Sequence, residues 1–433
     1  MAEVDAGESA RRSLRVFPAG SNGEFDLPRE LAVVVSRARG CELHDSEGRA
    51  YLDFSMGWGS VLVGHARAEV VRAVTARAAE GSNFACVSEP SLALAEEICR
   101  ASPACEQLRF CASGTEATMY CLRLARAHTG RPAILKFEGA YHGAHDAGVV
   151  SLFPRRAPDY PRGDPSSAGI PEAVTAGILV APYNDAATVE RIVAEHAAEL
   201  ACVIVEPLQR CTPPAPGFLE ALRAACARHG VLLVFDEVVT GFRLAYGGAQ
   251  EYYGVVPDLV AYGKALGGGY PIGAFGGRAE IMEHVREDRL GEPDYVWTAS
   301  TLGGNPVSAA AANAALAVLR EPGSYEHLHD IGRRLREGMR RVLAEHQEQA
   351  QVIGDGPLAQ VVFSREPVVD YRSTRLGDAA KARALMLALF RRGIFLNPMG
   401  TKLYLSLAHD AAACDAFLER FTEALRAVHA GRD

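Results

Sequence analysis

Short apolar segments alternate with helical segments over residues 107–262, and this alternation constrains the fold more than any other feature. Strands are predicted at Leu108–Cys111, Ala133–Lys136, Ala201–Val205 and Val231–Phe235, and helices at Thr115–Ala127, Ala187–Ala198 and Gly217–His229. The apolar runs are short and nearly continuous, which is typical of parallel strands buried on both faces. The pattern predicts an α/β protein with a mostly parallel sheet.

The flanking regions indicate how the chain is divided. Residues 1–30 are polar and read as an arm, residues 150–181 are rich in Pro, Ser and Gly and read as a long surface loop, and residues 350–433 read as strand, helix, strand, helix. We therefore expect an N-terminal arm with part of a small domain over 1–60, a large domain over 61–310, and a C-terminal small domain over 311–433. A chain of 433 residues buries enough surface to fold without a metal or a disulfide.

Charge and composition exclude several classes of partner. The formal net charge is −8, which argues against nucleic acid because phosphate binding requires a basic face. The sequence contains no apolar run long enough to cross a bilayer, and its opening residues do not resemble a secretory signal. The ten cysteines do not form CxxC pairs, so reduced thiols and a cytoplasmic location are expected.

Two charged residues follow predicted strands and are the first candidates for chemistry. Asp236 ends the run Val-Leu-Leu-Val-Phe-Asp, and Lys264 follows an apolar strand and precedes a glycine run. Their spacing fits one further crossover, which would place both above neighbouring strands, where open α/β sheets bind ligands. A buried lysine can attack a carbonyl, and a carboxylate facing a ring nitrogen keeps that nitrogen protonated. Taken singly, a solvated lysine and a helix-capping aspartate are the simpler interpretations.

A third candidate, Ser113-Gly114-Thr115, follows the first predicted strand of this region and opens a helix. Backbone N–H groups at a helix start can bind a phosphate, although a plain helix cap explains the same residues equally well. The glycines at 263 and 267–269 do not fit a dinucleotide motif, because they lead into Tyr-Pro-Ile-Gly rather than a helix. They more plausibly let the backbone approach a ligand closely.

The segment Tyr141-His142-Gly143 is the fourth candidate. An aromatic side chain here can stack on a flat ring. His142, His145 and Asp146 raise the alternative of a metal site, but the segment is not clearly helical and no third ligand is obvious nearby. No metal is expected.

In combination these motifs resemble the class III aminotransferases and, among them, the glutamate-1-semialdehyde aminomutases. The resemblance covers about residues 40–425 and rests on Ser-Gly-Thr-Glu-Ala, Tyr-His-Gly, Phe-Asp-Glu-Val-Val-Thr-Gly-Phe-Arg, Gly-Lys-Ala-Leu-Gly-Gly-Gly-Tyr-Pro-Ile-Gly-Ala and Thr-Leu-Gly-Gly-Asn-Pro. It implies a type I fold with a mainly parallel seven-stranded sheet, a smaller α+β domain, the cofactor pyridoxal 5'-phosphate, and a homodimer.

The resemblance also implies roles for particular residues. Lys264 matches the lysine that forms the Schiff base, and Asp236 matches the partner of the pyridine nitrogen. Thr301 matches a threonine that reaches the phosphate in the neighbouring subunit. The other matches concern the rest of the cofactor and the substrate. Gly114 and Thr115, with Ser113 beside them, match the phosphate-binding turn. Tyr141 and Val238 match the residues on the two ring faces, with His142 beside Tyr141; Glu206 and Gln209 lie near the ring hydroxyl, and Trp58 lies in the substrate pocket.

Two departures from the aminomutase pattern bear on the substrate. The stretch Ser21-Asn-Gly-Glu-Phe-Asp26 has no arginine where the aminomutases carry one that grips a carboxylate, and Lys402 stands at or near the position of an aminomutase Glu. An arginine that binds a substrate carboxylate through two parallel hydrogen bonds is hard to replace with an acidic residue. The departures favour an aminotransferase that moves an amino group between an amine donor and a keto or aldehyde acceptor of natural-product type, with Lys402 in the substrate pocket.

Three other functions stay open on the sequence alone. An aminomutase would isomerise one substrate without an added acceptor, and a racemase or epimerase of this fold would invert a centre without losing the amino group. A binding protein without activity is disfavoured by the intact Lys264 and Asp236.

Overall fold

The structure is a computed structural model that describes residues 8–22, 27–28, 31–398 and 400–431. It forms two compact units. Unit 1 contains residues up to 67, 326–368 and those from 374 onward, and unit 2 contains residues 68–325 and 369–373. Residues 311–325, expected in the C-terminal small domain, lie instead in unit 2. The reason is that helix α11 (Pro306–Leu319) packs against α3 (Ala68–Ala78) and α4 (Glu89–Ala101) of that unit.

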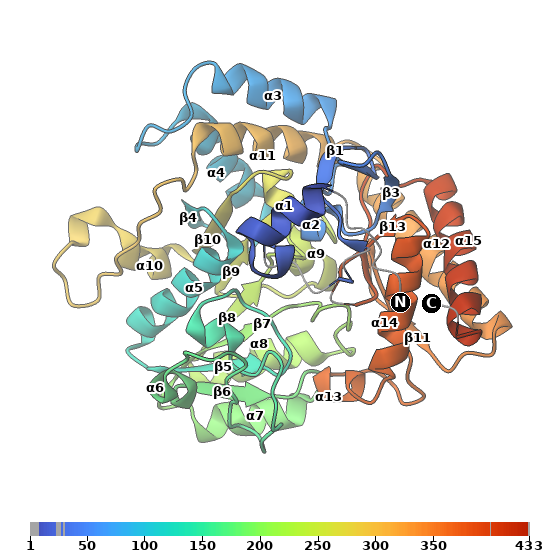
Figure 1. The fold of residues 1–433 in the computed structure, drawn as a ribbon. Helices are drawn as coiled ribbons and strands as arrows, with labels where there is room; N and C mark the ends of the chain where they lie inside the picture. Colours follow the sequence, from blue (N-terminus) through green and yellow to red (C-terminus); the bar gives the residue numbers. More distant parts are fainter. Residues whose placement is uncertain (1–7, 23–26, 29–30, 399, 432–433) are drawn as a thin grey trace. The chain divides into compact units, whose positions relative to one another are not determined.

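Unit 2 is built on a seven-stranded sheet with the order β4-β10-β9-β8-β7-β5-β6 (Figure 1). Its strands are β4 (Gln107–Cys111), β5 (Ala133–Phe137), β6 (Ile178–Ala181), β7 (Leu200–Val205), β8 (Leu232–Asp236), β9 (Leu259–Tyr262) and β10 (Gly273–Gly277). The pairs among β5, β6, β7, β8 and β9 are parallel, whereas β10 runs antiparallel to both β4 and β9. The predicted α/β fold with a mainly parallel seven-stranded sheet is confirmed.

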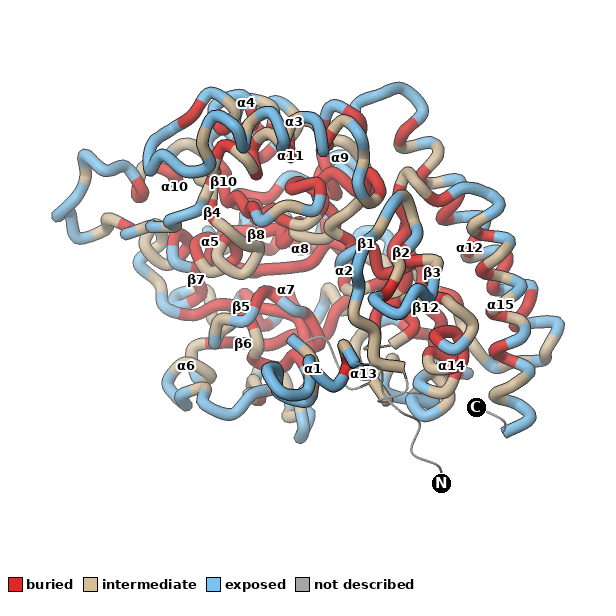
Figure 2. The backbone as a smooth tube through the Cα atoms, turned by 45° about the horizontal axis from the view of Figure 1, so that its top comes forward, coloured by how far each residue is buried: buried red, intermediate tan, exposed pale blue. Residues whose placement is uncertain are grey.

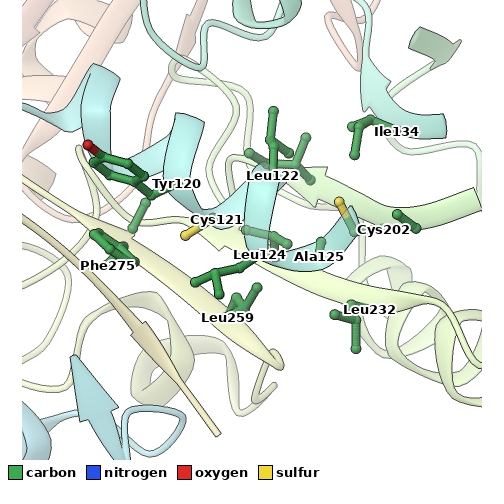
Figure 3. Close-up of a cluster of buried hydrophobic side chains, with 14 of the residues drawn as sticks. Tyr120, Cys121, Leu122, Leu124, Ala125, Ile134, Cys202, Leu232, Leu259 and Phe275 are labelled. Carbon is green, nitrogen blue, oxygen red and sulfur yellow. The ribbon is translucent and has the colours of Figure 1, made fainter. Parts of the chain in front are cut away.

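Helices cover both faces of this sheet, because successive strand residues point to opposite sides. On one face Ile134, Cys202 and Leu259 pack with Cys121 and Leu124 of α5 (Gly114–Thr129) (Figure 3). The adjacent strand positions face a second cluster that includes residues of α7 (Ala186–Glu195) and α8 (Phe218–His229). The central strands are therefore buried along their length (Figure 2).

The remaining elements of unit 2 are short and lie mainly in the connections. They are α6 (Glu172–Ala176), α9 (Gly248–Tyr253), α10 (Ala279–Met282), and the 3-10 turns η3 (Asp146–Val149), η4 (Lys264–Gly267), η5 (Glu283–Val285) and η6 (Glu287–Arg289). Because α6 and strand β6 fall within residues 150–181, the prediction of one long loop there is wrong in its last third. The Pro and Gly content of the loop hid a short strand at its end.

Strand β10 was not predicted, because glycine is a weak strand former. The structure explains its glycines by close approach of other backbone atoms. A Cβ added at Gly273 would lie 2.5 Å from the carbonyl oxygen of Ser113, and one at Gly277 would lie 2.3 Å from that of Asp258. At these positions only glycine allows β10 to fit between β4 and β9.

Unit 1 contains two small sheets and the long C-terminal helices. One sheet has the order β1-β2-β3-β13 and the other β11-β12-β14. Its strands are β1 (Val35–Arg39), β2 (Glu42–Asp45), β3 (Ala50–Asp53), β11 (Gln351–Ile353), β12 (Leu358–Val362), β13 (Ile394–Phe395) and β14 (Lys402–Tyr404). Its helices are α1 (Glu8–Val16), α2 (Met56–Gly59), α12 (Ser324–Glu345), α14 (Ala379–Arg391) and α15 (Ala411–His429), with η1 (Pro18–Gly20); the short α13 (Tyr371–Thr374) begins in unit 2.

Candidate active site

Asp236 and Lys264 lie at the carboxyl ends of neighbouring strands. Asp236 is the last residue of β8 and pairs with Ala261 of the parallel strand β9. Strand β9 ends at Tyr262, and Lys264 begins the turn η4 two residues later, with a φ of 43°. This left-handed backbone is unusual for a lysine and is a form of local strain that often marks functional positions. The sheet thus brings the two main candidates to the same edge.

Asp236 is held in a buried pair with His142. The Asp236 side chain is 4% exposed and its Oδ2 lies 2.7 Å from His142 Nδ1, while its Oδ1 accepts a hydrogen bond of 3.1 Å from the backbone N–H of Val238. His142 is 1% exposed. Its Nε2 has no hydrogen-bond partner among the described residues. Asp236 is therefore fixed in orientation, and the pair leaves one buried polar atom to be satisfied by something else.

Lys136 of strand β5 anchors the loop that carries His142. The sequence analysis did not identify this residue. Lys136 Nζ donates to the carbonyl oxygens of Ala140, Gly148 and Val150 at 3.0, 2.9 and 2.5 Å. Burial lowers the pKa of this lysine to about 7. The available signal was a lysine inside the otherwise apolar strand Ala133–Phe137.

A second interaction ties the same loop to helix α5. Thr118 Oγ1 donates to the carbonyl oxygen of His142 at 2.5 Å and lies 3.3 Å from His145 Nε2. Burial lowers the pKa of His145 to about 4, so this imidazole is neutral near pH 7. Hydrogen bonds from both the strand and the helix thus hold the loop in one conformation.

The turn at residues 113–115 is shaped by close contacts. Ser113 Oγ accepts from the N–H of Glu116 at 3.2 Å, so this serine caps α5. A Cβ added at Gly114 would lie 2.7 Å from Val238 Cγ1, and one at Gly143 would lie 2.7 Å from the Cα of Thr115. The positive end of the α5 dipole and its first N–H groups lie at this turn, as an anion site requires. The turn, the Tyr141–Gly143 segment and Val238 therefore adjoin one another.

Tyr141, Glu206 and Gln209 form the next part of the site. The backbone N–H of Tyr141 donates to Glu206 Oε1 at 2.7 Å, and the Arg210 guanidinium lies 5.6 Å from the centre of the Tyr141 ring. Gln209 Nε2 donates to the carbonyl oxygen of Glu138 at 2.7 Å. Gln209 Oε1 is buried without a hydrogen-bond partner among the described residues. Glu206 and Gln209 follow strand β7, so they reach the same sheet edge as Asp236.

Three predicted site residues make no contact described for this cluster, and two of them belong to the other unit. Thr301 lies in unit 2 on a groove of about 1080 Å³ lined by α4 and β4 residues, and its carbonyl oxygen accepts from Asn83 Nδ2 at 3.1 Å. Trp58 and Lys402 lie in unit 1. Trp58 has a φ of 59° within α2, and Lys402 Nζ is 4.8 Å from the centre of the Tyr404 ring. Of the N-terminal stretch at 21–26, Gly23–Asp26 lie outside the described residues.

Within residues 8–22, 27–28, 31–398 and 400–431, no three His, Cys, Asp or Glu side chains gather as a metal-binding group. Over the same ranges, no helix combines the length and apolarity that a bilayer-spanning segment needs.

Comparison with known proteins identifies the class. A family model described as aminotransferase class-III matches residues 27–425. Glutamate-1-semialdehyde 2,1-aminomutase of Pelotomaculum thermopropionicum is 41% identical over 426 residues, which cover 96% of this chain and 95% of that protein. The enzyme of the same name from Thermomicrobium roseum is 40% identical over 96% of each chain. This chain belongs to the class III aminotransferase family, as its motifs predicted.

Solved structures of the same class lie close to this one. An omega-transaminase from Sphaerobacter thermophilus superimposes with a TM-score of 0.93 at 36% identity, covering 99% of this chain and 98% of that chain. A glutamate-1-semialdehyde aminomutase from Pseudomonas aeruginosa gives a TM-score of 0.87 at 25% identity over 98% and 94% of the two chains. The fold is that of the type I pyridoxal-phosphate enzymes.

The cofactor is pyridoxal phosphate, and the residues at the sheet edge fit it. A transaminase with this cofactor bound superimposes with a TM-score of 0.88 at 31% identity over 98% of this chain and 97% of that one. The turn at Gly114 presents helix N–H groups on a backbone packed so closely against Val238 that it leaves no room for a Cβ, and Asp236 offers a fixed carboxylate. His142 Nε2 and Gln209 Oε1 are buried polar atoms that a ligand could satisfy.

Proposed function

We propose that this chain uses pyridoxal phosphate to move an amino group between carbon atoms of small amines and carbonyl compounds. The observation that carries the proposal is the placement of the Asp236–His142 pair and Lys264 at the ends of adjacent strands. A fixed carboxylate and an amine at one sheet edge are the two groups that this chemistry requires of the protein.

Each proposed residue has a distinct task. Ser113, Gly114 and Thr115 would hold the phosphate at the start of α5, and Tyr141 and Val238 would pack on the two ring faces. Asp236 would hold a proton on the ring nitrogen, and Glu206 and Gln209 would lie near the ring hydroxyl. When bound, pyridoxal phosphate supplies an electron-poor ring that accepts electrons as a Cα–H bond breaks. Lys264 Nζ would hold the cofactor aldehyde in the resting enzyme. Once a substrate amine has displaced it, the freed Nζ would take the proton from the substrate carbon and return it.

The aminomutase form of this reaction has the stronger support from relatives. Seven proteins named glutamate-1-semialdehyde 2,1-aminomutase are 38–41% identical to this chain over 92–96% of its length. In that form the amino group moves within one molecule, and no separate acceptor is needed.

Transamination between two molecules is the second candidate. It is supported by the TM-score of 0.93 to an omega-transaminase and by Lys402, which stands at or near the position of an aminomutase Glu. In either form Trp58 and Lys402 are proposed as substrate-pocket residues.

One experiment separates the candidates. Purified holoenzyme receives glutamate-1-semialdehyde alone, and NMR follows transfer of the amino group from C2 to C1; catalytic turnover without an acceptor supports the aminomutase. A parallel screen of amine donors, each with and without an added aldehyde or ketone, supports the transaminase if turnover requires both partners. Deuterium wash-in with no carbonyl product would indicate a racemase or epimerase. A colourless protein that binds no cofactor would overturn the proposal.

We further propose a homodimer in which Thr301 serves the neighbouring subunit's site. The exposed position of Thr301 on its groove supports this role. Lys264→Ala and Thr301→Ala subunits, each inactive or impaired alone, would regain activity on mixing, because one hybrid site combines Lys264 from one chain with Thr301 from the other. Unchanged activity on mixing, with co-purification of a tagged and an untagged variant showing that subunits exchange, would contradict the shared site.

A further inference from the structure

The chain leaves unit 1 for five residues near its C-terminal third. Residues 326–368 and 374–433 belong to unit 1, but Val369–Ser373, here called the strap, belongs to unit 2. The strap forms a compact turn of its own. Ser373 N–H donates to Asp370 Oδ1 at 2.8 Å, and the N–H groups of Val369 and Asp370 each donate to Ser373 Oγ at 2.9 Å.

The strap is bound to the rest of unit 2 by an ion pair between Arg372, whose side chain is 39% exposed, and the buried Glu138. Arg372 Nε and Nη2 donate to the two carboxylate oxygens of Glu138 at 2.8 and 3.1 Å, and Nη2 also donates to the carbonyl oxygen of Pro158 at 2.8 Å. Tyr160 donates its O–H to Glu138 at 2.9 Å, and its ring lies 4.2 Å below the guanidinium. The Glu138 side chain is 2% exposed. A two-point fork stacked on a ring fixes orientation as well as distance.

A second contact involves the next residue, Gly139. A Cβ added there would lie 2.3 Å from Tyr371 Cδ2, so the tyrosine ring packs directly on the glycine backbone, which has a φ of 78°. Asn184 Nδ2 donates to the carbonyl oxygen of Val369 at 2.9 Å. The strap therefore packs on the two residues that follow strand β5, two positions before Tyr141.

The same two residues are held from the other side by the segment after β7. Gln209 Nε2 donates to the carbonyl oxygen of Glu138 at 2.7 Å, and Arg210 Nε donates to that of Gly139 at 3.2 Å. The loop 138–142, here called the cofactor loop, is thus clamped between the strap and residues 206–210. Loss of the strap contacts would leave Glu138 and Gly139 held by residues 206–210 alone, while Lys136 and Thr118 still bond the later part of the loop.

We propose that Arg372 is a positioning residue that acts through Glu138 to hold the cofactor loop against pyridoxal phosphate. In sequence the strap is flanked on both sides by residues of unit 1. This role rests on the proposed function, because it assumes that Tyr141 and His142 contact the cofactor.

The test measures cofactor binding rather than turnover. Arg372→Met removes the guanidinium, Arg372→Lys keeps the charge without the fork, and Arg375→Met is the matched control, an exposed arginine three residues along the same segment. We expect Arg372→Met to raise the dissociation constant for pyridoxal phosphate about tenfold, since charge-assisted two-point bonds are among the strongest in proteins. The visible circular dichroism band of the bound cofactor should weaken with it. Arg372→Lys should give a smaller change, and Arg375→Met none.

Glu138→Gln supplies a second route to the same contact. It should reproduce the effect of Arg372→Met, and the double variant should be no worse than either single variant if the two residues act as one unit. If Arg372→Met does not fold, Arg372→Lys and Glu138→Gln carry the test.

The outcomes are separable. A lower melting temperature of the apoprotein with an unchanged dissociation constant and circular dichroism band would assign Arg372 to stability alone and overturn the inference. A wild-type protein that binds no pyridoxal phosphate would instead overturn the proposed function, and the role of the strap with it.

Discussion

The two units hold their candidate residues in different ways. In unit 2, Asp236 and His142 are buried, bonded to each other and carried by a sheet covered on both faces. In unit 1, Trp58 is half-buried in a four-residue helix with left-handed backbone, and Lys402 is half-buried in a three-residue strand. The difference shows that the residues proposed for cofactor chemistry are buried and bonded within a covered sheet, whereas those proposed for the substrate pocket lie on short, half-buried elements. Substrate choice is expected to depend on the short segments of unit 1.

The largest test of this contrast is Lys264→Ala. We expect turnover to fall at least about 1,000-fold, because the residue is proposed as the base that carries the proton. The yellow absorbance of the lysine-bound cofactor should also be lost. Lys402→Ala is the control: it should keep that absorbance while changing which substrates are used. Normal absorbance and turnover in Lys264→Ala would refute the assignment.

Unit 1 also contains a buried, hydrogen-bonded histidine, His409, and its protonation should lower the stability of the fold in acid. His409 is fully buried, with Nδ1 accepting from Ser406 N–H at 3.1 Å and Nε2 3.0 Å from the carbonyl oxygen of Asp53, so the ring is neutral. Burial lowers the pKa of His409 to about 4, against 6.5 for an unperturbed histidine. Between these values the unfolded state binds the extra proton, so stability is full above pH 6.5 and falls as the pH drops towards 4.

The expected loss from His409 is on the order of 3 kcal/mol in the free energy of unfolding. Urea denaturation at several pH values measures it, with His409→Gln as the comparison because glutamine does not titrate in this range. Equal pH slopes for the two proteins would show that His409 does not carry the effect.

Asp236→Asn keeps the shape of the buried pair in unit 2 and removes its charge. We expect turnover to fall about 100-fold, the size typical of removing one preorganised group from an active site. The free energy of unfolding should drop by only about 1 kcal/mol, since a neutral hydrogen bond to His142 replaces a charged one. A loss of stability without a loss of rate would mean that Asp236 serves the fold alone.

Gly114→Ala gives the smallest expected effect and probes the turn at the start of α5. The added Cβ would meet Val238 Cγ1 at 2.7 Å, so the side chain of Val238 must shift. Overpacking of this kind costs about 1–3 kcal/mol. We expect pyridoxal phosphate to bind about tenfold more weakly, as measured by absorbance titration. The matched control is Gly177→Ala, whose Cβ has its nearest neighbour at 3.6 Å; equal binding by both variants would contradict the role of the turn.

The parts of the site that could be predicted share a local signature. Asp236 and Lys264 each follow an apolar strand, and parallel pairing of β8 with β9 brings them to one edge. Ser113 was recognisable as a helix cap because it lies between the end of a predicted strand and the start of a predicted helix. Short apolar runs therefore predict both the sheet and the edge at which ligands bind.

The parts that were missed depend on contacts distant in sequence. Arg372 meets Glu138 across 234 positions, and neither residue has neighbours that mark it. Lys136 looks like an interruption of an apolar strand until its three carbonyl partners are seen. The prediction of strand β10 failed because its glycines are required by backbone atoms that pack on it, and local strand propensity does not reflect such contacts.

The antiparallel strand β10 has a consequence for how this protein is made. Strand β4, which precedes the turn at 113–115, is an edge strand whose partner in the described sheet is β10, formed by Gly273–Gly277. Translation delivers the N-terminal residues first. A nascent chain therefore carries an unfinished sheet edge for some 160 codons after β4 has left the ribosome, as the positions of the two strands require. We therefore expect the cofactor to bind only after residue 277 has been made, and fragments that end before it to aggregate through the unpaired strand edge.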